Sequence, residues 1–140
     1  LGAPAGSVLS GSKELIREAR HWRKMLGGGL RQVGVLAAAG LHALEHHVER
    51  LADDHANAAR LAAGLGELPG VDVDARNTNM VFISISDAPA DLLAQLTDRG
   101  ITTRIGIGAD GRATSRLVTH LGVDADDIET TIGAFSAALS

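Results

Sequence analysis

Residues 79–86 read NMVFISIS, and this apolar run decides the fold of the second half of the chain. Its Val, Phe and Ile residues predict a strand, because β-branched and aromatic side chains fit a pleated, half-buried surface. Just upstream, residues 71–75 read VDVDA and alternate apolar with polar side chains, which predicts a second strand. Downstream, residues 88–100 predict a helix that ends at Gly100.

Two more strands and a last helix complete this half. Residues 101–107 and 113–121 predict the strands, and residues 108–112 (GADGR) predict the turn between them. Asp124 is expected to cap a helix that runs through Leu139. The predicted order after a preceding helix is β-β-α-β-β-α, which is a small α/β sandwich with one layer packed on another.

The first half is expected to be mainly helical. A short strand is predicted at residues 7–10, and Ser12 is expected to cap the helix that follows. Three consecutive glycines at residues 27–29 end that helix, although three glycines together cost so much backbone entropy that they need a reason.

From Leu30 to Leu65 apolar residues recur at spacings of three and four, which predicts one long amphipathic helix. Its first part is apolar almost all round, whereas its second part has a polar face. This is the expected pattern of a helix that leaves one domain and enters another. We therefore expect residues 1–45 to end a first domain, and residues 46–140 to hold the connecting helix and a second domain.

Composition excludes several classes of protein. The 140 residues are 45% hydrophobic, enough for one ordinary domain or the remainder of a larger one. The absence of cysteine removes disulfides, thiolate nucleophiles and cysteine-ligated zinc, and a cytoplasmic protein is expected. A net charge of −4 and 2% aromatic residues argue against nucleic-acid binding. No apolar run approaches the roughly 18 residues that cross a bilayer. Because Leu1 opens within a turn-like stretch, we expect a fragment.

Two short motifs have simpler interpretations. Residues 6–13 (GSVLSGSK) approach a phosphate-binding loop, but Ser12 precedes Lys13, and a strand end followed by a helix cap explains the same residues. Residues 42–46 (HALEH) fit the H-x-x-E-H pattern of inverted zinc peptidases. No third ligand is evident, so a solvated, histidine-rich helix face is the favoured interpretation, and no metal site is predicted.

Cations supply the remaining candidates. Lys24 and Arg31 flank the glycines, where backbone amides at a helix start could approach a phosphate; a flexible hinge with solvated cations is the alternative. Arg116 lies in an apolar strand, where a cation is costly unless paired. It either meets an acidic side chain of its own domain or faces the carboxylate of a ligand.

Four stretches carry a family resemblance. They are LGAPAGSVLSGS (1–12), WRKMLGGGLRQVGVLAAAGLHALEHHVERLADDHANAARLA (22–62), NTNMVF (77–82) and RLVTHL (116–121). In this order they resemble the C-terminal part of low-specificity L-threonine aldolases. The resemblance implies fold type I of the pyridoxal-phosphate enzymes, which is the aspartate-aminotransferase-like fold. This chain is then expected to contain the end of the large domain, a long connecting helix and a small α/β sandwich domain.

The resemblance also implies a chemistry. Such an aldolase uses pyridoxal 5'-phosphate to cleave L-threonine or L-allo-threonine, both β-hydroxy amino acids, into glycine and acetaldehyde. A homo-oligomer, specifically a homotetramer built as a dimer of dimers, is implied as well. Another pyridoxal-phosphate-dependent β-eliminating lyase of the same fold stays open as an alternative. So does an inactive structural or oligomerisation module, if the chain acts alone.

Three positions match the family pattern. Arg116 matches the arginine that binds the substrate α-carboxylate, while Lys24 and Arg31 match basic residues near the cofactor at a subunit junction. The family's Schiff-base lysine falls immediately before LGAP, so it is expected upstream of Leu1, and no catalytic residue is assigned within this segment. Lys13 and Lys24 do not occupy that position.

Overall fold

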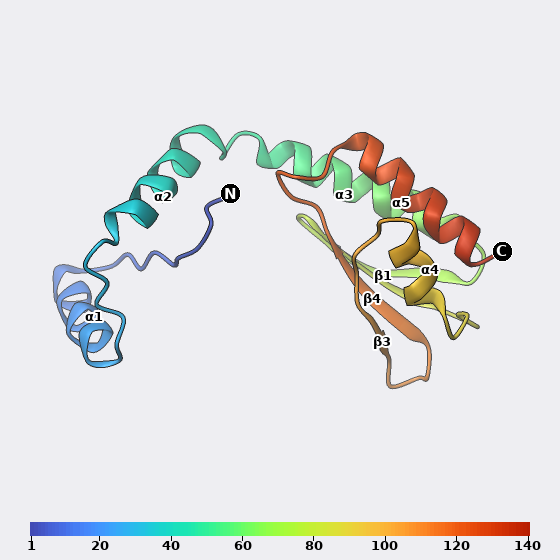
Figure 1. Ribbon diagram of the computed structural model, residues 1–140, viewed down its shortest axis with the longest axis horizontal. Coiled ribbons are helices and arrows are strands. Elements are labelled where there is room, and N and C mark those ends of the chain that lie inside the picture. Colours follow the sequence, from blue (N-terminus) through green and yellow to red (C-terminus); the bar gives the residue numbers. More distant parts are fainter. The chain divides into compact units, whose positions relative to one another are not determined.

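The computed structural model describes all 140 residues, and the chain divides into two compact units at residues 1–48 and 49–140. The second unit has the predicted order of elements. They are α3 (Leu51–Gly66), β1 (Val71–Asn77), β2 (Met80–Ile85), α4 (Leu92–Asp98), β3 (Ile105–Ile107), β4 (Ala113–Val118) and α5 (Ala125–Ala138). The predicted α/β class and the β-β-α-β-β-α order are therefore confirmed (Figure 1).

One antiparallel sheet in the order β1-β2-β4-β3 forms the base of this unit. Along β2 the side chains of Val81, Ile83 and Ile85 are buried, because successive residues of a strand point to opposite faces. These residues belong to one core with Leu65 of α3 and Phe135 of α5. The helices thus cover one face of the sheet, and the other is left open.

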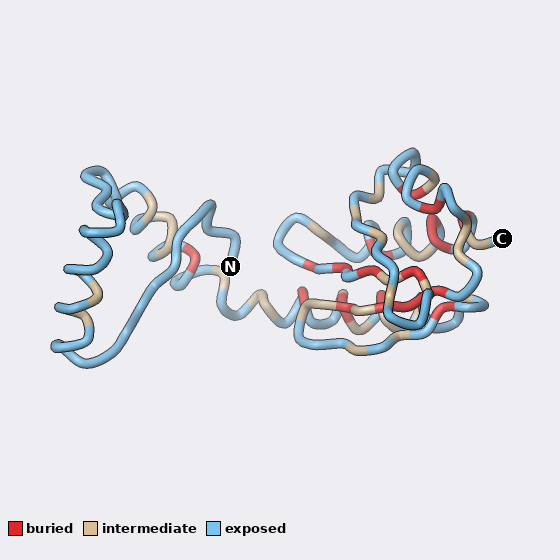
Figure 2. Tube along the Cα trace, turned by 90° about the horizontal axis from the view of Figure 1, so that it is seen from below, coloured by how far each residue is buried: buried red, intermediate tan, exposed pale blue.

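Most of the buried residues lie in this second unit, as Figure 2 shows in red. The core includes Leu92 and Leu96 of α4, whose side chains are fully buried. Helices α3 and α5 approach closely at Gly64, where a Cβ atom would lie 2.4 Å from Cδ1 of Ile132. Close packing of helices over one sheet face explains how a unit of this size obtains a continuous core.

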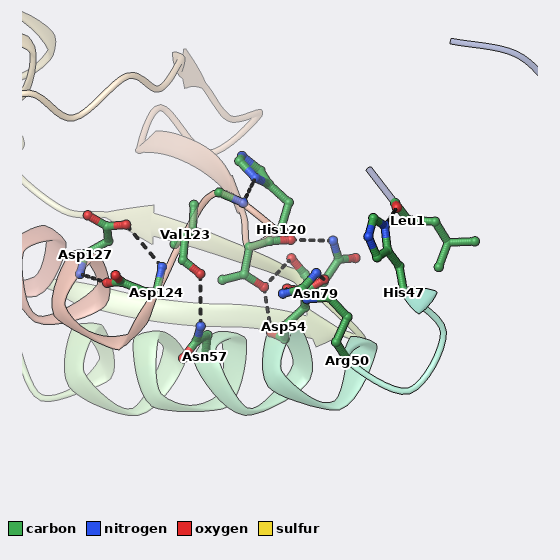
Figure 3. A network of polar contacts seen from close by, with 12 residues as sticks. Leu1, His47, Arg50, Asp54, Asn57, Asn79, His120, Val123, Asp124 and Asp127 are labelled. Carbon is green, nitrogen blue, oxygen red and sulfur yellow. Dashed lines mark hydrogen bonds and ion pairs between the residues drawn. The ribbon is translucent and has the colours of Figure 1, made fainter. Parts of the chain in front are cut away.

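A polar network holds the end of β4 against α3 and the β1–β2 turn (Figure 3). The buried hydroxyl of Thr119 donates to the carbonyl oxygen of Asp54 at 2.6 Å. Asn79 in the turn donates from Nδ2 to the Thr119 carbonyl at 2.7 Å, and the Thr119 amide donates to the Asn79 carbonyl at 2.9 Å. The network fixes Thr119, the residue that directly follows β4 and lies three positions after Arg116.

The first unit contains α1 (Lys13–Met25) and α2 (Gly34–His46). The predicted cap is confirmed, since the Leu15 amide donates to Oγ of Ser12 at 3.2 Å. The strand predicted at residues 7–10 is wrong, because that segment has no strand partner, and Val8 is 90% exposed. A β-strand exists only where a neighbour satisfies its backbone groups.

The glycines at residues 27–29 end α1 in a Schellman motif. Gly27 has a φ of +83°, the left-handed conformation that glycine adopts without a Cβ penalty. The Gly28 amide then donates to the Arg23 carbonyl at 2.8 Å, which satisfies one of the orphan carbonyls at the helix end. Helix α4 ends in the same way at Gly100, with φ of +81°, so the predicted stop at this residue is confirmed.

The single helix predicted from Leu30 to Leu65 is two helices. Helix α2 begins at Gly34, after a turn at residues 31–33, and ends at His46; α3 begins at Leu51. The chain bends at 47–50, and the division between the two units falls there. Apolar residues keep their spacing across the bend, so periodicity could not reveal it.

No helix of the chain is both long enough and apolar enough to cross a membrane.

Candidate functional site

Arg116 lies in the middle of β4, on the open face of the sheet. Its neighbours Ser115 and Leu117 are buried on the core face, whereas Arg116 is exposed. In the sheet register Arg116 pairs with Phe82 of β2, which in turn pairs with Ala75 of β1. The desolvation cost expected for a cation within an apolar strand therefore does not arise in this unit, because alternation turns the side chain away from the core.

A pocket of about 450 Å³ opens on this face beside Arg116. We call it the open-face pocket. It is lined by Asp74, Ala75, Phe82, Ile83, Arg104, Thr114, Ser115 and Arg116. An apolar wall from Phe82 and Ala75 thus meets polar groups from β4 and two guanidinium groups, the combination by which small polar ligands are oriented in proteins.

Neither Arg104 nor Arg116 has a carboxylate within 4.0 Å. Another arginine close by shows the contrast: Arg112 pairs with the Asp72 carboxylate at 2.7 Å and donates to the Ser84 carbonyl. Of the two possibilities that the sequence left open for Arg116, an acidic partner within its own domain is absent. The guanidinium remains available to an anion, which it can bind through two parallel N–H donors.

The one carboxylate in the open-face pocket belongs to Asp74. This residue is the extra residue of a β-bulge, since the pairing of β1 with β2 shifts between Val73 and Ala75. Its Oδ1 atom accepts a hydrogen bond from Oγ of Ser84 at 2.9 Å. Alternation along β1 places Asp74 on the same face as Asp72, and the bulge adds Ala75 to that face, opposite Phe82.

A second pocket, of about 630 Å³, is lined by residues of β4 and α5, and Arg116 is among them. Several of its other polar groups serve the fold: the Thr119 hydroxyl binds Asp54, and the Asp127 carboxylate accepts from the Asp124 amide in a capping box (Figure 3). His120 accepts from the Gly122 amide through Nδ1. The Arg116 guanidinium thus borders both pockets, whereas Arg104 lines only the open-face pocket, which is therefore the stronger candidate for a binding site.

Lys24 and Arg31 lie in the first unit, on either side of the glycine turn. Both are exposed, and neither takes part in a salt bridge. The Lys24 side chain covers Gly29, where an added Cβ atom would lie 2.9 Å from its Cδ atom. Gly28 is covered by Arg23 in the same way. The glycines therefore allow the stems of two cationic side chains to fold over the backbone turn.

The structure gives the local geometry of the two short motifs singled out in the sequence. Ser12 caps α1, as described above, which accounts for this part of the GSVLSGSK stretch. In the HALEH stretch the rings of His42 and His46 lie 4.4 Å apart between centroids. No group of three or more His, Cys, Asp or Glu side chains is arranged to hold a metal ion.

Sequence reasoning missed Arg104 and Asp74. Arg104 stands just before the three-residue strand β3, and only the register of β3 against β4 brings it beside Arg116. Asp74 reads as an ordinary polar residue of an alternating strand. Its place in the pocket depends on which strands pair beside it, and no local pattern indicates that.

Comparison with solved structures defines the fold. Phosphoserine aminotransferase SerC from Cytophaga hutchinsonii superposes with a TM-score of 0.61 at 10% identity, over 78% of this chain and 32% of that chain. A mutant of C-DES with glycine covalently linked to its PLP cofactor gives a TM-score of 0.56 at 24% identity, over 74% and 28%. These neighbours show the fold of the fold-type-I pyridoxal-phosphate enzymes, as the sequence predicted.

The family follows from the sequence comparisons. Residues 1–88 match the model of the beta-eliminating lyases, and the chain belongs to that family. Low specificity L-threonine aldolase of Escherichia coli K12 is 41% identical over the whole chain and 40% of its own length. Low-specificity L-threonine aldolase 1 of Arabidopsis thaliana is 39% identical over 99% of the chain and 39% of its length. The chain thus spans about two fifths of these relatives.

Proposed function

We propose that this chain is the C-terminal part of a low-specificity L-threonine aldolase, which cleaves L-threonine or L-allo-threonine into glycine and acetaldehyde. Relatives of that name at 39–41% identity, aligned over 99–100% of the chain, support the assignment. In this proposal residues 1–45 end the cofactor-binding large domain, and residues 46–140 form the connecting helix and small domain. The full protein is a cytoplasmic homotetramer, a dimer of dimers.

Pyridoxal 5'-phosphate, when bound, supplies an electron sink for the negative charge left at the substrate Cα after the Cα–Cβ bond breaks. The chain contributes cations that suit the anionic groups of such a system. Arg116 binds the substrate α-carboxylate through its guanidinium fork, while Lys24 and Arg31 lie near the cofactor. The single observation that carries the assignment of Arg116 is its free guanidinium in the open-face pocket.

The Schiff-base lysine is proposed to lie upstream of Leu1. The chain has two lysines: Lys13 opens α1, and Lys24 folds over the glycine turn. Both belong to the first unit, and neither stands at the position of the family's Schiff-base lysine. The 140 residues by themselves are therefore proposed to be inactive and to serve as a structural and oligomerisation module of the full enzyme.

A second reaction class, β-elimination by another pyridoxal-phosphate-dependent lyase of the same fold, is the alternative, because the family model is that of beta-eliminating lyases. A related lyase would share the fold and the carboxylate-binding arginine. Product analysis separates the classes, because retro-aldol cleavage of threonine yields glycine and acetaldehyde, whereas β-elimination yields a 2-oxo acid and ammonia.

The test is Arg116→Ala in the full-length enzyme. Loss of a charge-assisted bidentate contact raises the KM for L-threonine by about 10- to 100-fold. The cofactor absorbance persists, because the arginine holds the substrate and not the cofactor. Arg76→Ala, an exposed arginine of β1 outside the open-face pocket, is the matched control and keeps the KM of the parent enzyme. An unchanged KM in Arg116→Ala removes this residue from the site.

A further inference from the structure

The open-face pocket holds a second arginine that faces the first. Strands β3 and β4 pair Ile105 with Ser115 and Ile107 with Ala113. Continuing this antiparallel register by one position places Arg104 directly opposite Arg116. Ile105 takes part in packing against the core, so by alternation Arg104 points to the open face. Both guanidinium groups line the pocket.

Two like charges at opposite positions of a strand pair repel one another. Three arginines of the second unit pair with acidic side chains, Arg50 with Asp54, Arg60 with Glu129 and Arg112 with Asp72. Arg76 and Arg99 have no ion pair, but they lie outside the open-face pocket. Arg104 and Arg116 have no acidic partner within 4.0 Å. An anion held between the two guanidinium groups removes the repulsion and uses donors that are otherwise free.

The charges that line the pocket indicate what kind of anion fits. Two guanidinium groups and the carboxylate of Asp74 leave one net positive charge. One carboxylate balances that charge, whereas a dicarboxylate would face the uncompensated repulsion of Asp74. The Ser84 hydroxyl binds Asp74 and keeps its carboxylate in place at the bulge.

We propose that Arg104 is a second carboxylate-binding residue, which clamps the substrate α-carboxylate together with Arg116 and selects amino acids with a single carboxylate. This inference rests on the proposed function, since it adds a residue to the site assigned to Arg116. Opposite residues of paired strands have Cβ atoms about 5 Å apart, so two arginine side chains reach a common carboxylate from the same side. The position of the carboxylate, and with it the orientation of the substrate, is then fixed by two forks instead of one.

Arg104→Ala and Arg104→Lys in the full-length enzyme test the proposal, with Arg76→Ala as the control outside the pocket. Arg104→Ala is expected to raise the KM for L-threonine and the inhibition constant for acetate by about tenfold, while kcat stays within about twofold. Added guanidinium chloride is expected to restore part of the lost affinity in Arg104→Ala. Arg104→Lys, which keeps the charge but lacks the fork, is expected to lie between the parent and Arg104→Ala.

The outcomes separate this inference from the proposed function. If Arg116→Ala raises KM and Arg104→Ala does not, Arg104 is no part of the site and the proposed function stands. If neither variant changes KM, both assignments fail. A fall in kcat with unchanged KM and unchanged acetate inhibition also overturns the role proposed for Arg104. Because this side chain is exposed and makes no hydrogen bond within the chain, the variant is expected to fold, and circular dichroism checks that it does.

Discussion

Asp54→Ala breaks a buried ion pair, and it should cost more unfolding free energy than Glu129→Ala, which breaks an exposed one. Asp54 lies in the first turn of α3 and is 3% exposed. Arg50 donates to it twice, from Nη2 to Oδ1 at 2.7 Å and from Nη1 to Oδ2 at 3.3 Å (Figure 3). Truncation to alanine leaves the Arg50 guanidinium without a partner, although the Thr119 bond to the Asp54 carbonyl is retained because it uses the backbone.

The expected size of the effect follows from exposure. Removing one partner of a fully buried pair costs about 3–5 kcal/mol, because a charge remains desolvated and unpaired. The Arg50 side chain is 22% exposed and regains some hydration, so the expected loss of unfolding free energy is about 2–3 kcal/mol. Glu129→Ala breaks a pair with Arg60 of the same length, 2.7 Å, whose side chains are 54–56% exposed. That loss is expected to be about 0–1 kcal/mol.

Urea unfolding of the 140-residue chain, followed by far-ultraviolet circular dichroism, measures both losses. Trp22, the single tryptophan, lies in the first unit, so its fluorescence does not report on the second. Asp53→Ala is a further control, because Asp53 occupies the same helix turn but is exposed and forms no ion pair. It isolates the interaction with the helix dipole. Equal losses for Asp54→Ala and Glu129→Ala would refute the reasoning that burial decides the value of the pair.

Three other predictions concern two helix glycines of the second unit and two cations of the first unit. Gly133→Ala in α5, where an added Cβ atom meets nothing within 4 Å, should raise the unfolding free energy by about 1 kcal/mol. Gly64→Ala in α3 should lower the unfolding free energy by about 1 kcal/mol, because the added methyl group meets Ile132. Adding Ile132→Ala to the same chain should remove this clash. If Gly64→Ala alone raised the unfolding free energy, the packing described for this site would be contradicted. In the full-length enzyme, Lys24→Ala or Arg31→Ala should weaken cofactor retention or assembly about tenfold, as gel filtration and cofactor absorbance would measure, since each removes a charged contact. Holoenzyme tetramers of normal stability in both variants would exclude those roles.

The order of elements in the second unit was predictable because local signals agree with the tertiary structure there. The alternation of Val81, Ile83 and Ile85 with outward residues sets one buried face, and the register of the sheet follows from it. Gly100 ends α4 through a left-handed residue, which sequence alone indicates. Each of these signals depends only on residues that are close in the sequence, so it can be recognised without knowledge of the tertiary structure.

Features that depend on distant partners were not predictable. The strand expected at residues 7–10 requires a neighbouring strand, and the sequence of that segment does not say whether one is present. The bend at 47–50 interrupts an apolar pattern that itself continues, so it reflects the division into units and not a helix breaker. Both differences arise from contacts made or missing far along the chain.

The candidate site also depends on distant partners, and this explains why the sequence indicated Arg116 but not Arg104 or Asp74. Arg116 could be recognised because a cation in an apolar strand is unusual at the level of a few residues, and because its motif resembles a family pattern. Arg104 sits in a polar-looking segment, where an exposed arginine is ordinary. Its significance arises from the register of β3 with β4 and from the lack of an acidic partner, both of which are properties of the sheet. A candidate residue of this kind is found by asking which unpaired charges line the same pocket.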